Sequence, residues 1–339
     1  MFKSPLPRLF LLTLAFALAG SVVPSTAIAS PWTQPKGKVA IKIAADYQWA
    51  QKEWLIDGDF QEYSLNGRFH GGNLRLGVRY GITPRLEVGA QMKISHVEYQ
   101  ADEVWLGPPI TPAVSEITTG TELAASMISL DRSVTGVGDV DIWVKVRVSP
   151  LDFWRVVFTP SLELKIPTGY DSPSGTFTDD DPSAGVSDDV TLGDGQLDIT
   201  VRAHGGFVPH PRWFIRTDIG FRARFFGPGQ QIVGGAKTGV RIGRFFIPYV
   251  EGTIEHTITE GDVVGVSFST SSPEIPADEF RAADLKPLEI RLDRSILTIR
   301  AGTIFSMDTW EVDIGYSGVL WGRNTSRVHT ITAGVTLKL

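Results

Sequence analysis

Residues 38–50 read KVAIKIAADYQWA, and this stretch decides the fold. Every odd position from Val39 to Trp49 is apolar, whereas Lys38, Lys42 and Asp46 fall on even positions. Successive side chains of a β-strand point to opposite faces of the sheet. The stretch therefore predicts a strand with one apolar and one polar face, and such a pattern fixes the register of the strand.

The same alternation recurs in eleven further segments, so twelve strands are predicted in all: 39–49, 74–80, 86–94, 140–148, 156–166, 197–207, 213–225, 232–242, 246–258, 297–305, 310–316 and 331–339. Their apolar faces contain no Lys, Arg, Asp or Glu. A lipid-facing strand requires this, because Arg or Lys at the middle of a bilayer costs about 2–4 kcal/mol. The sequence predicts an all-β, antiparallel up-and-down transmembrane barrel of twelve strands, with ten and fourteen as the limits.

Connection lengths support the same architecture. Every second connection is short, and the long ones are residues 50–71, 100–136, 169–194, 259–292 and 318–327, with the brief 227–229 as an exception. This alternation, with an even strand count, is typical of outer-membrane barrels and places both termini in the periplasm. Aromatic residues flank the short turns and predict an interfacial girdle: Phe153, Trp154, Phe207, Trp213, Phe245, Phe246, Phe305 and Trp310. Pro160 and Pro248 lie inside predicted strands, where we expect local bulges.

The first 29 residues resemble a secretory signal. Lys3 and Arg8 precede the apolar run 9–20, and Ala27-Ile28-Ala29 forms a cleavage site after Ala29. The predicted mature chain, residues 30–339, is a single domain without cysteine. Losing Lys3 and Arg8 leaves 32 − 2 = 30 basic and 38 acidic residues, a net charge of −8. No basic domain stands out, so nucleic acid is not an expected partner.

Several short motifs resemble two related groups of outer-membrane proteins. These are residues 79–89 (RYGITPRLEVG), 136–141 (GVGDVD), 164–169 (LKIPTG) and 193–198 (GDGQLD). They resemble the MetA-pathway of phenol degradation family and an uncharacterised proteobacterial family of similar length. The first resemblance implies a channel for aromatic or other hydrophobic compounds. Hydrophobic-compound transporters carry an N-terminal plug, whereas only residues 30–38 precede the first strand here.

The polar faces carry more basic than acidic side chains, and the basic ones concentrate on predicted strands six to eight. The candidate lumen-lining residues are Arg202, Arg216, Asp218, Arg222, Arg224, Lys237, Arg241, Glu251 and Glu255. Two interpretations remain open. Either salt bridges fill a narrow barrel, or a narrow polar pore with a mild preference for anions results, because a low-dielectric channel focuses the field. Large apolar residues are scarce on these faces, which makes the lumen a poor path for hydrophobic solutes.

The sequence thus predicts passive passage of small molecules across the outer membrane. The alternative is a non-conducting structural or surface-interaction barrel. A third reading, a lipid hydrolase, would depend on His256 in Glu255-His256-Thr257, and no matching serine signature follows it. We predict no enzyme activity, cofactor or metal. The aspartates of loop 169–194 could bind Ca²⁺ through oxygen ligands, but the spacing fits no EF-hand. Expected partners are outer-membrane lipid, lipopolysaccharide, the barrel-assembly machinery and a small-molecule solute.

Overall fold

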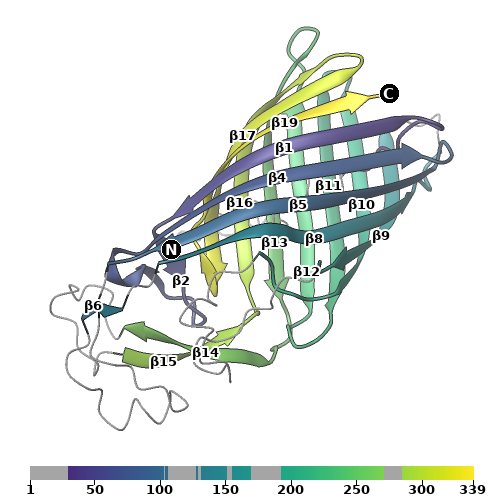
Figure 1. Ribbon diagram of the computed structural model, residues 1–339. Helices are drawn as coiled ribbons and strands as arrows, with labels where there is room; N and C mark the ends of the chain where they lie inside the picture. Colours follow the sequence, from purple (N-terminus) through teal and green to yellow (C-terminus); the bar gives the residue numbers. More distant parts are fainter. Residues whose placement is uncertain are drawn as a thin grey trace, which may run out of the picture.

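A computed structural model describes residues 30–102, 104–105, 127–128, 131–150, 155–168, 192–270 and 285–339. The predicted signal, residues 1–29, lies outside this range. Twelve antiparallel strands close into a barrel in the order β1-β19-β17-β16-β13-β12-β11-β10-β9-β8-β5-β4 (Figure 1). Their bounds are β1 Val39–Ala50, β4 Arg68–Gly81, β5 Leu86–Gln100, β8 Arg132–Val146, β9 Val156–Ile166, β10 Asp198–His210, β11 Trp213–Arg224, β12 Gln231–Val240, β13 Phe246–Thr257, β16 Ser295–Ser306, β17 Trp310–Arg323 and β19 His329–Lys338.

All twelve predicted strands are present, so the predicted fold class is confirmed. The first and last strands pair from Ala40↔Lys338 to Trp49↔His329, and two backbone hydrogen bonds between Val39 and Leu339 extend this seam. The closure leaves the barrel without an unpaired edge. An edge would otherwise expose unsatisfied backbone groups to hydrocarbon.

Strand β8 starts eight residues before its predicted beginning because a register shift interrupts its alternation. Met92 pairs with Val140, but Ile94 pairs with Val137, so β8 carries one extra residue at this point. A bulge of this kind reverses which sequence positions face outward. The alternation of apolar and polar residues is therefore interrupted at Gly138 and Asp139. For this reason the sequence pattern does not predict the part of β8 that precedes them.

The expected bulges at Pro160 and Pro248 are not found. Pairing runs through Pro160↔Ala203 and Pro248↔Thr303 without a shift. Each proline strand also pairs with a second neighbour. On that side, the β8–β9 ladder ends at residue 161 and the β12–β13 ladder ends at residue 249. Each proline therefore lies one residue beyond a ladder, where no backbone donor is required.

The barrel is apolar outside and polar inside. Ile219 and Val201, on the outer surface, are 63% and 60% exposed, and most other exposed large side chains are aliphatic or aromatic. The inner faces of the barrel strands carry buried charged residues such as Lys145, Arg202 and Glu255, all under 5% exposed. A continuous apolar exterior of this kind marks a membrane-facing surface.

Aromatic residues lie at the end of the barrel that carries the short turns, which we call the turn end. Phe207, Trp213, Phe245 and Trp310 are exposed there, and the rings of Phe246 and Phe305 lie 5.5 Å apart. The predicted girdle residues Phe153 and Trp154 lie outside the described residues. These positions suit an interfacial belt.

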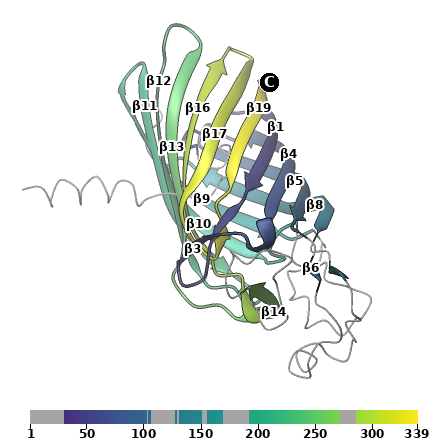
Figure 2. The same ribbon diagram turned by 90° about the vertical axis from the view of Figure 1, so that its left-hand side faces the viewer.

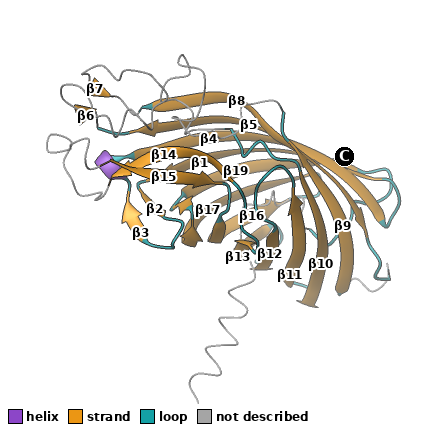
Figure 3. Cartoon of the chain, turned by 90° about the horizontal axis from the view of Figure 1, so that it is seen from below, coloured by secondary structure: helices purple, strands orange, loops and turns teal. Residues whose placement is uncertain are grey.

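The opposite end, which we call the loop end, carries the remaining secondary structure. Small sheets there are formed by β2 (Lys52–Trp54), β3 (Phe60–Glu62) and β18 (Thr325–Ser326), by β6 (Val104–Trp105) and β7 (Met127–Ile128), and by β14 (Val263–Thr270) and β15 (Leu285–Arg291). Figure 2 shows several of these strands gathered at the end opposite the C-terminus. The short helix η1 (Ser64–Asn66) lies at the same end (Figure 3). Within the described residues, no helix is long and apolar enough to span a membrane.

Candidate functional site

The candidate residues of the lumen fall into two groups. Arg202, Arg216, Asp218, Arg224, Lys237, Glu251 and Glu255 are buried inside the barrel, and Arg222 is half-buried there. Arg241 differs, because β12 ends at Val240. It lies exposed in the following turn, where its Nη1 donates a hydrogen bond to the carbonyl oxygen of Arg244 at 3.3 Å. The structure thus brings eight of the nine candidates together.

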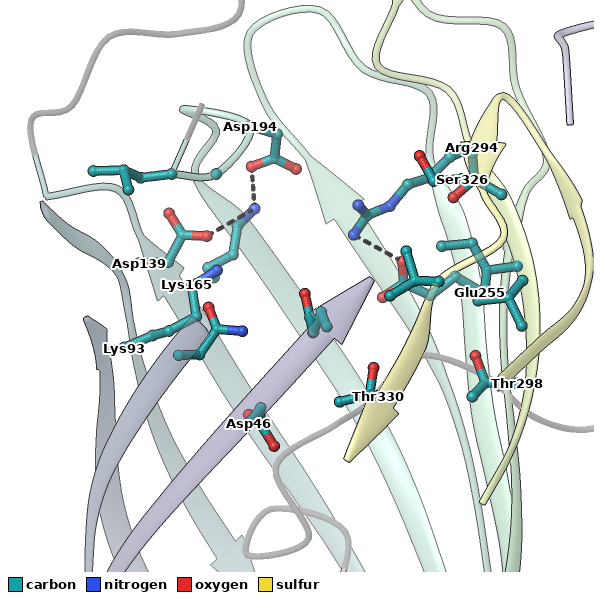
Figure 4. Close-up of a pocket in the computed structure, with 18 of the residues that line it drawn as sticks. Asp46, Lys93, Asp139, Lys165, Asp194, Glu255, Arg294, Thr298, Ser326 and Thr330 are labelled. Carbon is teal, nitrogen blue, oxygen red and sulfur yellow. Dashed lines mark hydrogen bonds and ion pairs between the residues drawn. The ribbon is translucent and has the colours of Figure 1, made fainter. Parts of the chain in front are cut away.

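A cavity of about 650 Å³ occupies the loop half of the lumen. Its walls come from both sides of the barrel: Asp139, Lys165 and Lys93 lie on one side, and Arg294 and Glu255 on the other (Figure 4). Six acidic and six basic residues line it, so their formal charges cancel: Asp46, Asp139, Asp141, Glu163, Asp194, Glu255, Arg75, Lys93, Lys165, Arg202, Arg222 and Arg294. The cavity therefore carries no net charge.

Residues 192–196 narrow the loop-end mouth of this cavity. Leu192 and Gln196 are buried, and a Cβ on Gly136 would lie 2.6 Å from the Leu192 side chain. Asp194 forms ion pairs with both Lys165 and Arg224. Burial alone would raise the pKa of Asp194, but the Lys165 ammonium and the Arg224 guanidinium hold it well below its usual range. The segment is thereby tied to strands β9 and β11.

Further ion pairs line the cavity walls. Lys165 lies 2.9 Å from Asp198 and 3.9 Å from Asp139. On the opposite side, Glu255 accepts from Arg222 at 2.7 Å and lies 3.4 Å from Arg294. Deeper in the lumen, Arg202 joins Glu163 at 3.0 Å and Asp218 at 2.7 Å. The pairs of Lys165 and Arg202 bridge neighbouring strands, whereas Arg222 on β11 reaches Glu255 on β13 across β12. In each case the opposite charge offsets part of the cost of burial.

The turn half of the lumen is filled more completely. Glu251 forms an ion pair with Arg216 and lies 3.5 Å from Lys237. The Lys237 ammonium also lies 3.4 Å from the centre of the Tyr249 ring. The Tyr249 hydroxyl donates to Asp313 at 2.6 Å, and Arg300 lies 3.2 Å from the same carboxylate. These contacts support the sequence-based interpretation of a salt-bridged interior for this half.

Residues 30–35, which precede β1, enter the lumen. The sequence pattern does not predict this. Pro31 is fully buried, and its carbonyl accepts from Thr159 at 2.5 Å. The Ser30 carbonyl accepts from Lys145 at 3.1 Å, and the backbone N–H of Gln34 donates to the Glu87 carboxylate at 2.8 Å. Gly206 leaves room for this packing, since a Cβ there would lie 2.7 Å from the Pro31 ring. A short peptide thus takes the place where a plug domain would lie.

Two Ser–His contacts also appear. Ser161 Oγ lies 2.9 Å from His204 Nε2 and donates to Glu163 at 3.0 Å. His204 is fully buried and its Nδ1 has no hydrogen-bond partner within the described structure. The Glu163 carboxylate lies 3.8 Å from Nε2 and not at Nδ1, so no described residue orients the ring as a general base requires.

The second contact lies on the outside of the barrel, where His256 Nδ1 is 3.1 Å from Ser295 Oγ. No matching serine signature follows His256 in the sequence, but Ser295 on the adjacent strand places a hydroxyl beside its ring. Ser295 is only 2% exposed, and no third side chain forms a hydrogen bond with the histidine ring among the described residues.

In the described part of the chain, no three His, Cys, Asp or Glu side chains are grouped in a way that could hold a metal ion. The acidic residues 169–191, where a calcium site was weighed, lie outside the described residues.

Comparisons with known proteins show the fold. No family model and no curated protein matches the sequence. An outer membrane channel from Pseudomonas putida F1 is 10% identical, with 94% of this chain and 100% of that chain covered and a TM-score of 0.59. The translocator domain of the autotransporter NalP from Neisseria meningitidis is 9% identical (97% and 96% covered, TM-score 0.45), as is the CymD monoaromatic hydrocarbon channel (94% and 94%, TM-score 0.41). The likeness to the Pseudomonas channel identifies the chain as having the fold of an outer-membrane barrel.

Proposed function

We propose that this protein is a passive outer-membrane channel for small polar solutes. The observation that carries the proposal is the cavity of about 650 Å³, lined by equal numbers of acidic and basic residues, inside a barrel whose exterior is apolar. A volume of this size is typical of small-molecule sites. The apolar belt would contact outer-membrane lipid and lipopolysaccharide after insertion by the barrel-assembly machinery, with both termini in the periplasm.

The polar lining favours hydrophilic over aromatic solutes. Of the residues around the cavity, the large apolar ones are Phe69, Val97, Leu192, Leu292, Ile296, Val319 and Val328. The deeper wall presents Arg202, Glu163 and Thr200 instead. A hydrophobic compound moving inward would have to leave the lining charges partly desolvated, which is costly. The aromatic substrates that the family resemblance implies are therefore not part of the proposal.

We also propose that the channel discriminates little between anions and cations, because the charges of the cavity lining cancel. Because six acidic and six basic residues line the cavity, neither sign of ion gains a large advantage there. We expect a reversal potential near zero across a tenfold KCl gradient in a planar bilayer. A mild preference for anions would restore the sequence-based expectation, and a preference for cations would contradict both.

A second candidate, a non-conducting barrel, is favoured by the filled turn half. Segment 30–35 forms hydrogen bonds there with the fully buried Lys145 and Glu87. Planar-bilayer recordings test the two candidates directly. A channel predicts stepwise currents from the mature chain and larger steps from a variant lacking residues 30–35. The absence of current from both proteins would leave the non-conducting barrel.

A further inference from the structure

Two charged residues of the cavity, Lys93 and Asp141, form no direct ion pair with any other described residue. Ten of its twelve charged residues take part in an ion pair within 4 Å; Lys93 and Asp141 do not, considering the part of the chain that the structure describes. Gln91, also in the cavity wall, is 8% exposed, and its amide has no hydrogen-bond partner among the same residues. A cation, an anion and an amide thus remain available in one wall.

The register explains why these three side chains lie together. Gln91 on β5 pairs directly with Asp141 on β8, and Lys93 follows Gln91 by two positions on the same face. The bulge of β8 lies beside Lys93, and a Cβ on Gly138 would come within 2.8 Å of the Lys93 Cε. The missing side chain at Gly138 therefore leaves space for the lysine stem to cross the bulge. Lys93 lies next to the Asp139–Lys165 pair in the same wall (Figure 4).

An ionised group that is removed from bulk water requires a partner of opposite charge. A solute with one ammonium and one carboxylate satisfies both groups at once, because Asp141 can accept from the ammonium and Lys93 can donate to the carboxylate. Such a solute also keeps the cavity neutral, which a singly charged solute does not. The Gln91 amide can both donate and accept, so it can bond either end.

We propose that Lys93, Asp141 and Gln91 form a binding site for small zwitterions of the α-amino-acid type. This inference rests on the proposed channel function and specifies its solute class. The site lies in the wall of the loop half, behind the constriction of residues 192–196. Bound solute would interrupt the ion current while it occupies the cavity.

Single-channel recordings of the mature protein in planar bilayers test the site with L-alanine as the probe. Propionate and alaninamide, which carry one charge each, are the matched ligands. We expect alanine to block the current at a concentration at least tenfold lower than either analogue. Hydrogen bonds to charged groups contribute about 1.5–3 kcal/mol, and 1.4 kcal/mol corresponds to a factor of ten. Equal blocking by all three compounds would overturn the zwitterion site.

Variants separate a specific site from a general change of the lumen. Lys93→Met and Asp141→Asn should each raise the half-blocking concentration of alanine about tenfold. Arg85→Gln removes an exposed cation at the turn end and should leave that concentration unchanged. The double exchange Lys93→Asp with Asp141→Lys preserves both charges and should recover most of the blocking. A double exchange no better than the single variants would contradict paired recognition.

Failure of the channel proposal gives a different result from failure of the site. If the wild type conducts and alanine blocks no better than its analogues, only the zwitterion site is refuted. If the wild type does not conduct, the channel proposal falls, and thermal unfolding in detergent decides the site. Alanine should then raise the unfolding temperature of the wild type but not that of Lys93→Met. No increase for the wild type would refute the site as well.

Discussion

The apolar exterior can be tested most directly at Ile219. This residue lies six positions after Trp213, the first residue of β11, and its side chain is 63% exposed. Six residues at about 3.4 Å each cover about 20 Å along the strand. At a tilt of about 40°, this corresponds to about 15 Å along the membrane normal, near the middle of an apolar band about 25 Å tall. We expect Ile219→Arg to lower the free energy of unfolding by about 2–4 kcal/mol.

Val240 supplies the matched control. It ends β12, pairs directly with Trp213 and is 45% exposed at the turn end. Arginine near the interface costs only about 0–1 kcal/mol. Guanidinium unfolding in lipid vesicles, followed by tryptophan fluorescence, should therefore place Val240→Arg well above Ile219→Arg in stability. Equal stability of the two variants would show that hydrocarbon does not surround the middle of β11.

Three further predictions concern the lumen and its mouth. Glu251→Gln should lower the free energy of unfolding by about 3 kcal/mol, because it leaves two buried cations without their carboxylate; a loss below 1 kcal/mol in a denaturant titration would contradict this. Because the folded-state pKa of Asp194 is lowered, its contribution is complete above the unfolded value and is lost only as pH falls through the folded value. The difference in current between the wild type and Asp194→Asn should thus be the same at pH 7 and at pH 4; loss of this difference at pH 4 would refute the ion pairs of Asp194. Gly89→Ala should reduce heat stability, since the new Cβ would lie 2.3 Å from Trp143, whereas Gly72→Ala meets nothing within 4 Å and serves as the control.

The two halves of the lumen suggest different roles for its charges. In the turn half, Glu251 with its cations and the Tyr249–Asp313–Arg300 group fill the space between strands. In the loop half, the pairs line the walls and leave a cavity. The charged side chains of the turn half meet between neighbouring and next-neighbouring strands. In the turn half these contacts hold the strands together, and in the loop half the side chains along the walls leave room for a solute.

The sequence determined the number of strands, their inward and outward faces and the end at which the short turns lie. These follow from the alternation of apolar and polar side chains along each strand, which is a local property of the chain, and from the free-energy cost of placing a charge in hydrocarbon. The extra residue in β8 escaped the pattern because a bulge interrupts that periodicity at Gly138.

Only the tertiary structure decided which charges pair. Asp194 follows Lys165 by 29 positions and precedes Arg224 by 30, and no local pattern indicates that it joins them. The entry of Pro31 into the lumen depends likewise on the space at Gly206, far away in the chain. Barrel closure brings distant strands side by side, and the contacts across the lumen depend on this closure rather than on the local periodicity that sequence reveals.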